Sequence, residues 1–389
     1  MIDFSNTEIA FSNKSDKELK KTVWLFSMMN KPWLVKWGSS LGLTAINWRL
    51  PFARTIIKST IFEQFCGGET FSDSLAAINK LAQFNTATVL DYGAEAKESE
   101  ADFDRTRNET IAAIRFAAQH KTVPLVSTKV TGMARFDLLA KIDARQSLSA
   151  AEQEEWSRAV KRVDNVCAEA HAQKIGIFID AEESWIQEAI DDVAVLMMQR
   201  YNREQAIVFD TFQMYRHDRF AYLTTLYERS RTDGYILGAK LVRGAYMEKE
   251  RKRAAEMGYE SPINPSKEDT DRLYNTALTF CIEHYQRMAS WNATHNQQST
   301  QLQVTMMHDL DIDKKHPHLN FCQLYGMSDN LTFNLAAAGY NVAKYMPYGT
   351  VREVIPYLIR RAQENTAVTG DMSREYQLLA AEMKRRNLH

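Results

Sequence analysis

Lysine and arginine side chains gather at the end of one apolar, strand-like segment of the sequence. The stretch "KLVRGAYMEKER", residues 240–251, starts with Lys240, carries Arg243 three positions later and breaks at Gly244. A strand on the surface could carry these cations without any role in binding. A strand that ends at a ligand could instead use them to bind an anionic or electron-rich group.

Other apolar, β-branched runs also end in polar or aromatic residues. These residues are Lys129, Asp180, Asp210, Gln213, Thr294, His295, Asn296, Gln323, Leu324 and Tyr345. One such residue would most often be a solvated neighbour in a loop. Their recurrence from run to run indicates that they line a single rim, where the strands of a barrel end and the loops begin.

Eight short apolar runs alternate with amphipathic helical stretches. The runs cover residues 86–93, 123–130, 174–181, 206–212, 235–244, 289–295, 319–325 and 341–349. Among the intervening stretches, residues 149–173 open with Ser149 and Glu152, the spacing of a capping box. This alternation favours an α/β fold with a (β/α)8 barrel over an open sheet. No glycine-rich dinucleotide fingerprint or phosphate loop follows a run, which disfavours a Rossmann or P-loop protein.

The chain divides by pattern into a helical arm, residues 1–85, and a barrel with a C-terminal helix, residues 86–389. The formal net charge of −1 over 389 residues provides no basic field for nucleic acid. The four cysteines are widely spaced, so we expect reduced, buried thiols. The pair His316 and His318 is weak evidence for zinc, and we expect no metal and solvent-facing rings.

The N-terminus predicts neither a secretory signal nor a transit peptide, because it is acidic and lacks an apolar core. Residues 33–52 are the most membrane-like stretch, but Lys36 and Arg49 leave too few uncharged residues for a span. Trp33, Trp37 and Trp48 could lie on a membrane surface. Packing of this stretch as an amphipathic helix on the main domain is the favoured alternative.

Two adjacent arginines follow the last strand-like run. Arg360 and Arg361 occur in "TVREVIPYLIRRAQEN", which has helical spacing. A helix that ran down the outside of the barrel would carry the pair away from the rim onto a basic surface. A helix across the barrel mouth would point them inward, where they could bind a carboxylate bidentately. The pattern alone does not choose between the two.

Taken together and in order, these motifs resemble the proline dehydrogenase family. The matching stretches are "STKVTG", "DAEE", "KLVRGAY", "THN", "CQLYGM" and "KYMPYG" followed by "EVIPYLIRRAQEN". The resemblance implies a distorted (β/α)8 TIM barrel whose eighth helix lies over the barrel mouth. It also implies FAD as cofactor, oxidation of L-proline to Δ1-pyrroline-5-carboxylate as the first step of proline catabolism, and a membrane quinone as electron acceptor.

The resemblance also implies roles for single residues. Arg360 and Arg361 would bind the proline carboxylate, and Lys129 and Asp180 would form an ion pair beside it. The residues packing the pyrrolidine ring would be Tyr246, Leu324, Tyr345 and Tyr357. Those contacting the cofactor would be Ala181, Asp210, Gln213, Lys240, Arg243, Gly244, Ala245, Thr294, His295, Asn296 and Gln323. Asp180, Lys240 and Arg243 would be catalytic, with a cation stabilising the reduced, anionic flavin.

The sequence departs from some bacterial members at Lys240, where they have arginine, and at Asp210, where they have glutamine. Tyr345 argues for proline, because hydroxyproline-preferring relatives tend to have a small hydroxylic residue there. Without the resemblance, Lys129 and Asp180 could equally be a structural ion pair. Tyr345 and Tyr357 could likewise be core aromatics, and His295 could cap a helix.

Other functions remain open on the sequence. A hydroxyproline-preferring flavin dehydrogenase is the closest enzymatic alternative, and a non-catalytic barrel that serves as a binding protein is the other. We expect a cytoplasmic protein, with a peripheral contact at the inner face of the cytoplasmic membrane as the option left by residues 33–48. No nucleic-acid partner is expected.

Overall fold

The structure is a computed structural model that describes residues 2–29, 51–93, 98–367 and 371–388. The chain forms two compact units. The first unit comprises Met1–Ala94, His295–Gln297 and Cys322–His389, and the second comprises Glu95–Thr294 and Gln298–Phe321. The predicted boundary between residues 85 and 86 falls inside the first unit.

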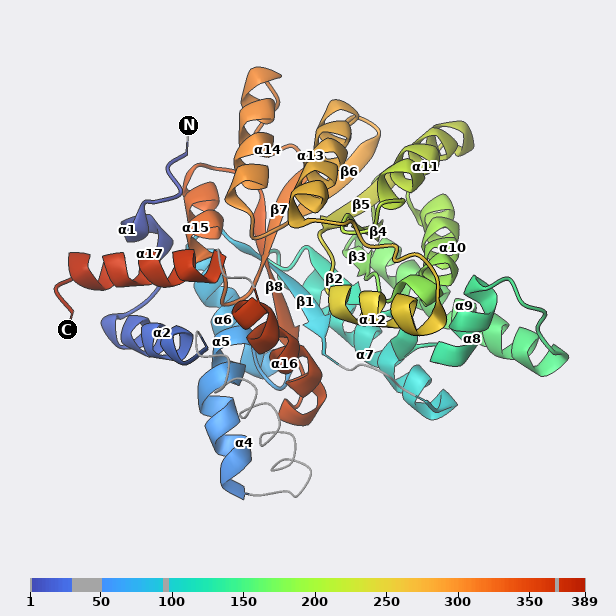
Figure 1. The fold of residues 1–389 in the computed structure, drawn as a ribbon, viewed down its shortest axis with the longest axis horizontal. Coiled ribbons are helices and arrows are strands. Elements are labelled where there is room, and N and C mark those ends of the chain that lie inside the picture. Colours follow the sequence, from blue (N-terminus) through green and yellow to red (C-terminus); the bar gives the residue numbers. More distant parts are fainter. Residues whose placement is uncertain (1, 30–50, 94–97, 368–370, 389) are drawn as a thin grey trace. The chain divides into compact units, whose positions relative to one another are not determined.

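Eight strands form a closed barrel in sequence order, β1 to β8 (Figure 1), which confirms the predicted fold class. They are β1 (Ala87–Tyr92), β2 (Leu125–Thr128), β3 (Gly176–Ile179), β4 (Val208–Gln213), β5 (Leu237–Val242), β6 (Met288–Ala293), β7 (Leu319–Leu324) and β8 (Val342–Tyr348). Each overlaps one of the eight apolar runs. Parallel strands joined by helices must bury both faces, so their runs read as continuously apolar.

The second unit carries β2 to β6 and the helices that follow them. These are α7 (Glu100–Ala118), η2 (Val130–Gly132), α8 (Phe136–Asp143), α9 (Ala150–Gln173), α10 (Ser184–Tyr201), α11 (Arg219–Asp233), α12 (Met247–Met257), α13 (Lys267–Glu283) and most of α14 (Gln297–Asp309). The predicted capping box is present at α9, where Ser149 and Glu152 satisfy each other's backbone amides. In register, Thr211 pairs with Lys240 and Lys240 with Trp291, so these three side chains share one face of the sheet.

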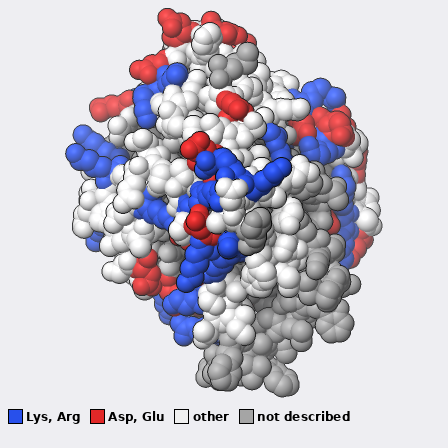
Figure 2. Space-filling model, turned by 90° about the vertical axis from the view of Figure 1, so that its left-hand side faces the viewer, with Lys and Arg blue, Asp and Glu red and all other residues white. Residues whose placement is uncertain are grey.

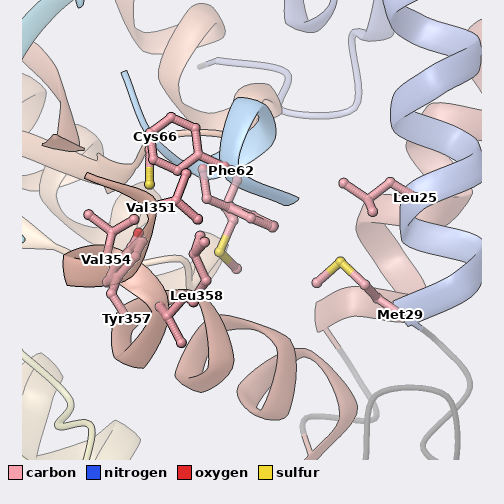
Figure 3. Packing of buried hydrophobic residues seen from close by; sticks show 11 residues of the cluster. Leu25, Met29, Phe62, Cys66, Val351, Val354, Tyr357 and Leu358 are labelled. Atoms are coloured by element: carbon pink, nitrogen blue, oxygen red, sulfur yellow. The ribbon is translucent and has the colours of Figure 1, made fainter. Parts of the chain in front are cut away.

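The first unit holds β1, β8 and both ends of the chain. Its helices are α1 (Thr7–Ala10), α2 (Asp16–Met29), α4 (Pro51–Ile57), η1 (Lys58–Phe62), α5 (Glu63–Phe65), α6 (Phe71–Gln83), α15 (Asp329–Ala337), α16 (Val351–Ala367) and α17 (Asp371–Arg385). One apolar cluster joins α2, η1, α5 and α16 (Figure 3). Val354 and Leu358 of α16 pack in it with Phe62 of η1 and with Leu25 and Met29 of α2. This burial explains why the arm and α16 form one unit.

Charged side chains on the first unit are largely paired across helices. Lys80 of α6 contacts Glu18 of α2 at 2.5 Å, and Lys58 of η1 contacts Glu69 at 2.6 Å. In Figure 2, acidic side chains lie between the basic ones on the face that it shows. Mixed charges of this kind fit the formal net charge of −1 and disfavour a nucleic-acid surface there.

The structure also describes the cysteines and the histidine pair. All four cysteines are free and buried, as expected. The described residues contain no helix long and apolar enough to cross a membrane, and no cluster of metal-ligating residues. The stretch from Trp33 to Trp48 lies outside the described residues. The expectation that His316 and His318 face solvent is wrong, because both are half-buried and the Nδ1 of His318 lies 2.7 Å from the carbonyl oxygen of Tyr285.

Two glycines allow a matched test of the first unit. Gly326 and Gly339 both have positive φ, 79° and 88°. A Cβ at position 326 would lie 2.0 Å from the carbonyl oxygen of Gln64, whereas a Cβ at 339 would meet nothing within 4 Å. We expect Gly339→Ala to lower the free energy of unfolding by about 1 kcal/mol and Gly326→Ala to lower it by more than about 3 kcal/mol. Urea titrations of both variants measure this, and equal losses would contradict the close approach.

Candidate functional site

A buried carboxylate between two lysines forms the centre of the predicted site in the second unit. Lys240 of β5 donates to Oδ1 of Asp180, directly after β3, at 2.6 Å. The Nζ of Lys129, directly after β2, lies 3.9 Å from Oδ2 of the same carboxylate. The three side chains are between 7% and 13% exposed. Two cations on one anion leave a net positive charge in a sparsely hydrated place, which favours an anionic or electron-rich ligand.

An aromatic ring completes the surroundings of Lys240. Its Nζ lies 4.7 Å from the centroid of the Phe178 ring, and Phe178 itself packs edge-on against Trp291. The ammonium group therefore has an ionic partner and a ring face as neighbours. Such a restrained cation keeps one position while a ligand binds.

A second carboxylate supports this cluster from the following loop. Glu182 accepts hydrogen bonds from the amide and hydroxyl of Thr131, two residues beyond Lys129. Its backbone carbonyl accepts a hydrogen bond from Nε2 of Gln213 at 2.6 Å. Burial raises the pKa of Glu182 to about 7, against the opposing effects of Thr131 and Lys129. The loop after β3 thus ties together the ends of β2, β3 and β4.

Arg243 is held at the end of β5 on the side of α13. It donates to Asp271 at 2.7 Å, to the hydroxyl of Thr294 at 2.6 Å and to the hydroxyl of Ser299 at 3.0 Å. Its guanidinium also lies 4.3 Å from the ring centroid of Tyr274. The structure therefore brings together Arg243 and Thr294, two of the predicted cofactor residues. The adjoining Gly244 and Ala245 are exposed and Tyr246 is half-buried, before α12 begins.

The position of Asp210 contradicts its predicted role in cofactor binding. Its neighbour Thr211 shares the face of Lys240, so Asp210 points to the opposite face of β4. It is fully buried there beside the ion pair of Asp191 and Arg219, from α10 and α11. Burial, and then the negative charge of Asp191, raise its pKa well above the usual range. Alternation along a strand puts Asp210 and Gln213 on opposite faces, and the neighbouring ion pair of Asp191 and Arg219 shows that Asp210 is the one facing the helices.

The first unit carries the predicted arginine pair on α16. Arg361 is 8% exposed and its guanidinium lies 5.3 Å from the ring centroid of Tyr357, one turn earlier. Arg360 is half-buried. Of the two alternatives that the sequence pattern left open, the exposed basic surface does not hold for Arg361. Burial of a guanidinium beside an aromatic face suits the binding of a planar carboxylate.

Other predicted residues of the first unit lie on β7, β8 and the loop before α14. Tyr345 is 7% exposed, and its carbonyl accepts the amide of Tyr325, which follows Leu324. The hydroxyl of Thr332 donates to Oε1 of Gln323 at 2.9 Å.

The loop residue His295 is half-buried, and its Nδ1 lies 2.8 Å from the hydroxyl of Ser328. Its neighbour Asn296 is also half-buried, as is Ala181 in the second unit.

Sequence reasoning missed the residues that support the predicted ones. These are Thr131, Glu182, Asp271, Ser328 and Glu375. Glu182 could have been found, because it lies in the quoted motif "DAEE" two residues after Asp180. Asp271 and Glu375 lie in amphipathic helical stretches among many other charges, where spacing alone gives no sign of their partners.

The raised pKa of Glu182 predicts a pH dependence of stability. Between its ordinary value of 4.5 and about 7, the folded chain keeps a proton that the unfolded chain releases. Stability from this group is therefore lost as pH rises through that window. Glu182→Gln keeps an acceptor for Thr131 and cannot ionise. Its stability relative to the parent should rise between pH 5 and pH 8, by on the order of 3 kcal/mol at most. Urea unfolding across this range measures the difference, and parallel curves would contradict it.

Comparisons with known proteins show which family and which fold this chain is similar to. A family model described as proline dehydrogenase matches residues 74–374. A hydroxyproline dehydrogenase from Xenopus laevis is 30% identical over 99% of this chain and 90% of its own length. Mitochondrial proline dehydrogenase 1 from Dictyostelium discoideum is 32% identical over 85% of this chain, which covers 65% of that protein.

A solved structure supports the fold. Proline utilization A from Bdellovibrio bacteriovorus superposes with a TM-score of 0.74 at 20% identity, over 93% of this chain. The chain spans 38% of that protein's length. The family match covers most of the chain and includes both the Lys129–Asp180–Lys240 cluster and the arginine pair of α16. The chain therefore belongs to the proline dehydrogenase family.

Proposed function

We propose that this protein is an FAD-dependent proline dehydrogenase that oxidises L-proline to Δ1-pyrroline-5-carboxylate, the first step of proline catabolism. The observation that carries the proposal is the buried carboxylate of Asp180 between Lys240 and Lys129. Membership of the family supplies the reaction class, and the cluster supplies a charged, restrained site in which such a reaction can take place.

The donors of the second unit fit a flavin dinucleotide. Lys240 is 6% exposed and has excess positive charge beside it, which suits an electron-rich ring. The bound FAD would supply the two-electron acceptor. Lys240, Gln213 and Ala181 would hold its ring system, and Gln323 of the first unit is proposed as a further contact. Arg243, Gly244, Ala245 and Thr294 would hold its ribityl and phosphate parts. From the first unit, His295 and Asn296 are proposed as further contacts of the dinucleotide.

The substrate is a small zwitterion, so it needs one group for its carboxylate and a wall for its ring. Arg360 and Arg361 would bind the carboxylate with paired N–H groups. Tyr246, Leu324, Tyr345 and Tyr357 would pack against the pyrrolidine ring, and Lys129 and Asp180 would line the substrate pocket as an ion pair. Proline loses a hydride from C5, the carbon next to nitrogen that does not carry the carboxylate, and a proton from nitrogen. The residues named here contribute by orienting that carbon and excluding water.

A membrane quinone is the proposed electron acceptor, by likeness to the family. A cytoplasmic location with peripheral contact at the membrane would bring the protein to this quinone. Measuring reoxidation with a short-chain quinone and with dioxygen separates this acceptor from its main alternative.

A hydroxyproline dehydrogenase is the second candidate. The specific observation in its favour is the 30% identity to such an enzyme over 99% of this chain. The buried phenol of Tyr345 favours proline, because a bulky ring there leaves less room for a hydroxyl on the substrate. A non-catalytic barrel would give a colourless preparation.

Purified protein should be yellow and should bleach anaerobically when L-proline is added. Arg361→Ala should bind FAD normally and lower kcat/KM for proline by about 100-fold or more, since it removes a buried charged partner of the carboxylate. Arg352→Ala is the matched control, because Arg352 lies on the exposed face of the same helix. A parent protein that binds FAD and does not bleach with proline would overturn the assignment.

Tyr345 provides a separate test of substrate choice. Tyr345→Ser should lower kcat/KM for L-proline by about 10-fold through lost ring contact. The loss for trans-4-hydroxy-L-proline should be smaller, so the ratio of the two constants moves toward hydroxyproline. Steady-state kinetics with both amino acids measure this, and an unchanged ratio would remove Tyr345 from substrate selection.

A further inference from the structure

The turn between β7 and α15 has an unusual backbone that the C-terminal helix holds. Ser328 has φ 51° and ψ 44°, the left-handed region, which few residues with a Cβ adopt. Its amide donates to both carboxylate oxygens of Glu375 on α17, at 2.8 and 3.0 Å. Glu375 is 9% exposed. A buried carboxylate that accepts a backbone amide stabilises this conformation and fixes the direction of the Ser328 side chain.

The Ser328 side chain contacts the loop of residues 295–297, which contains the predicted cofactor residues His295 and Asn296. Its hydroxyl lies 2.8 Å from Nδ1 of His295. The residue before Glu375, Arg374, donates to the side-chain amide oxygen of Gln297, two positions after His295. Residues 295–297 belong to the same compact unit as α17. Two consecutive residues of α17 therefore hold this three-residue loop at both of its ends.

The charges around Glu375 are compensated nearby. Asp329 follows Ser328 and is bound by Lys344 of β8 at 2.9 Å and by Lys14 of the N-terminal arm at 3.2 Å. Burial, and then the negative charge of Asp329, raise the pKa of Glu375 to about 7. Lys344 and Lys14 act against this effect and also lower the pKa of Asp329, although burial opposes that. Lys14 of the N-terminal arm and Glu375 of α17 thus both contact this turn.

We propose that Glu375 and Arg374 are positioning residues that orient His295 for the dinucleotide, through Ser328 and Gln297 respectively. The proposal rests on the proposed function in one respect only, the assignment of His295 to the cofactor. The contact between the Ser328 hydroxyl and Nδ1 restricts the plane of the imidazole and so the direction of the whole ring. The C-terminal helix then acts on cofactor binding without itself touching the cofactor.

The imidazole of His295 reports on this link without any flavin. Ser328→Ala removes the hydroxyl and keeps a Cβ in the same backbone, and Glu375→Ala removes the anchor of the turn. In the apo-protein, both should change the ¹H–¹³C NMR signal of His295 and its titration. Glu382→Gln is the matched control, because this buried carboxylate lies on the same helix and pairs with Arg385 and Arg386 instead. It should leave the His295 signal in place.

Fluorescence titration with FAD is the second measurement. Glu375→Ala should weaken FAD binding by about 10-fold and Ser328→Ala by about 5-fold, while Glu382→Gln should bind as the parent does. If Glu375→Ala does not fold, Ser328→Ala decides alone.

Unchanged His295 signals in both variants would overturn the link. A parent that binds no FAD would instead refute the proposed function, and the NMR comparison would still decide the link. Changed His295 signals with unaltered FAD affinity would overturn the role in cofactor positioning.

Discussion

The site depends on one buried carboxylate with two lysines. Asp180 can hold Lys240 and Lys129 only because the ends of β3, β5 and β2 meet on one side of the parallel sheet. Each lysine would be costly to bury alone, and the shared anion offsets that cost incompletely. The two lysines and one aspartate together carry a net positive charge. The register of the strands sets the position of this charge. A ligand that accumulates negative charge is the natural complement of such a place.

A buried aspartate between two lysines also occurs in the first unit, where it supports a turn. In the first unit, Asp329 lies between Lys344 and Lys14 and is 4% exposed. Lys344 and Tyr345 are consecutive residues of β8, so their side chains point to opposite faces of the strand. The lysine therefore anchors the turn after β7 through Asp329, and the tyrosine occupies the opposite face of the strand.

Barrel architecture alone says little about which molecule is oxidised. The solved structure with a TM-score of 0.74 shares only 20% identity, and both a proline and a hydroxyproline dehydrogenase match this chain at about 30%. Discrimination between two such similar substrates rests on a few contacts around the ring. Tyr345, buried on β8, is the residue that we propose for that choice.

By itself, the sequence determined the eight strands, the helix cap at Ser149 and the family. Strands buried on both faces appear as apolar runs, and a capping box is a local hydrogen-bond pattern, so neither depends on distant residues. Tertiary structure alone decided that Asp210 faces the helices while Gln213 faces the other way, and that Glu375 grips Ser328. The physical reason is that burial and ion pairing depend on which segments meet in space. Glu182 and Thr131, like Glu375 and Ser328, are about 50 residues apart in the chain, and no local pattern predicts that they will be in contact.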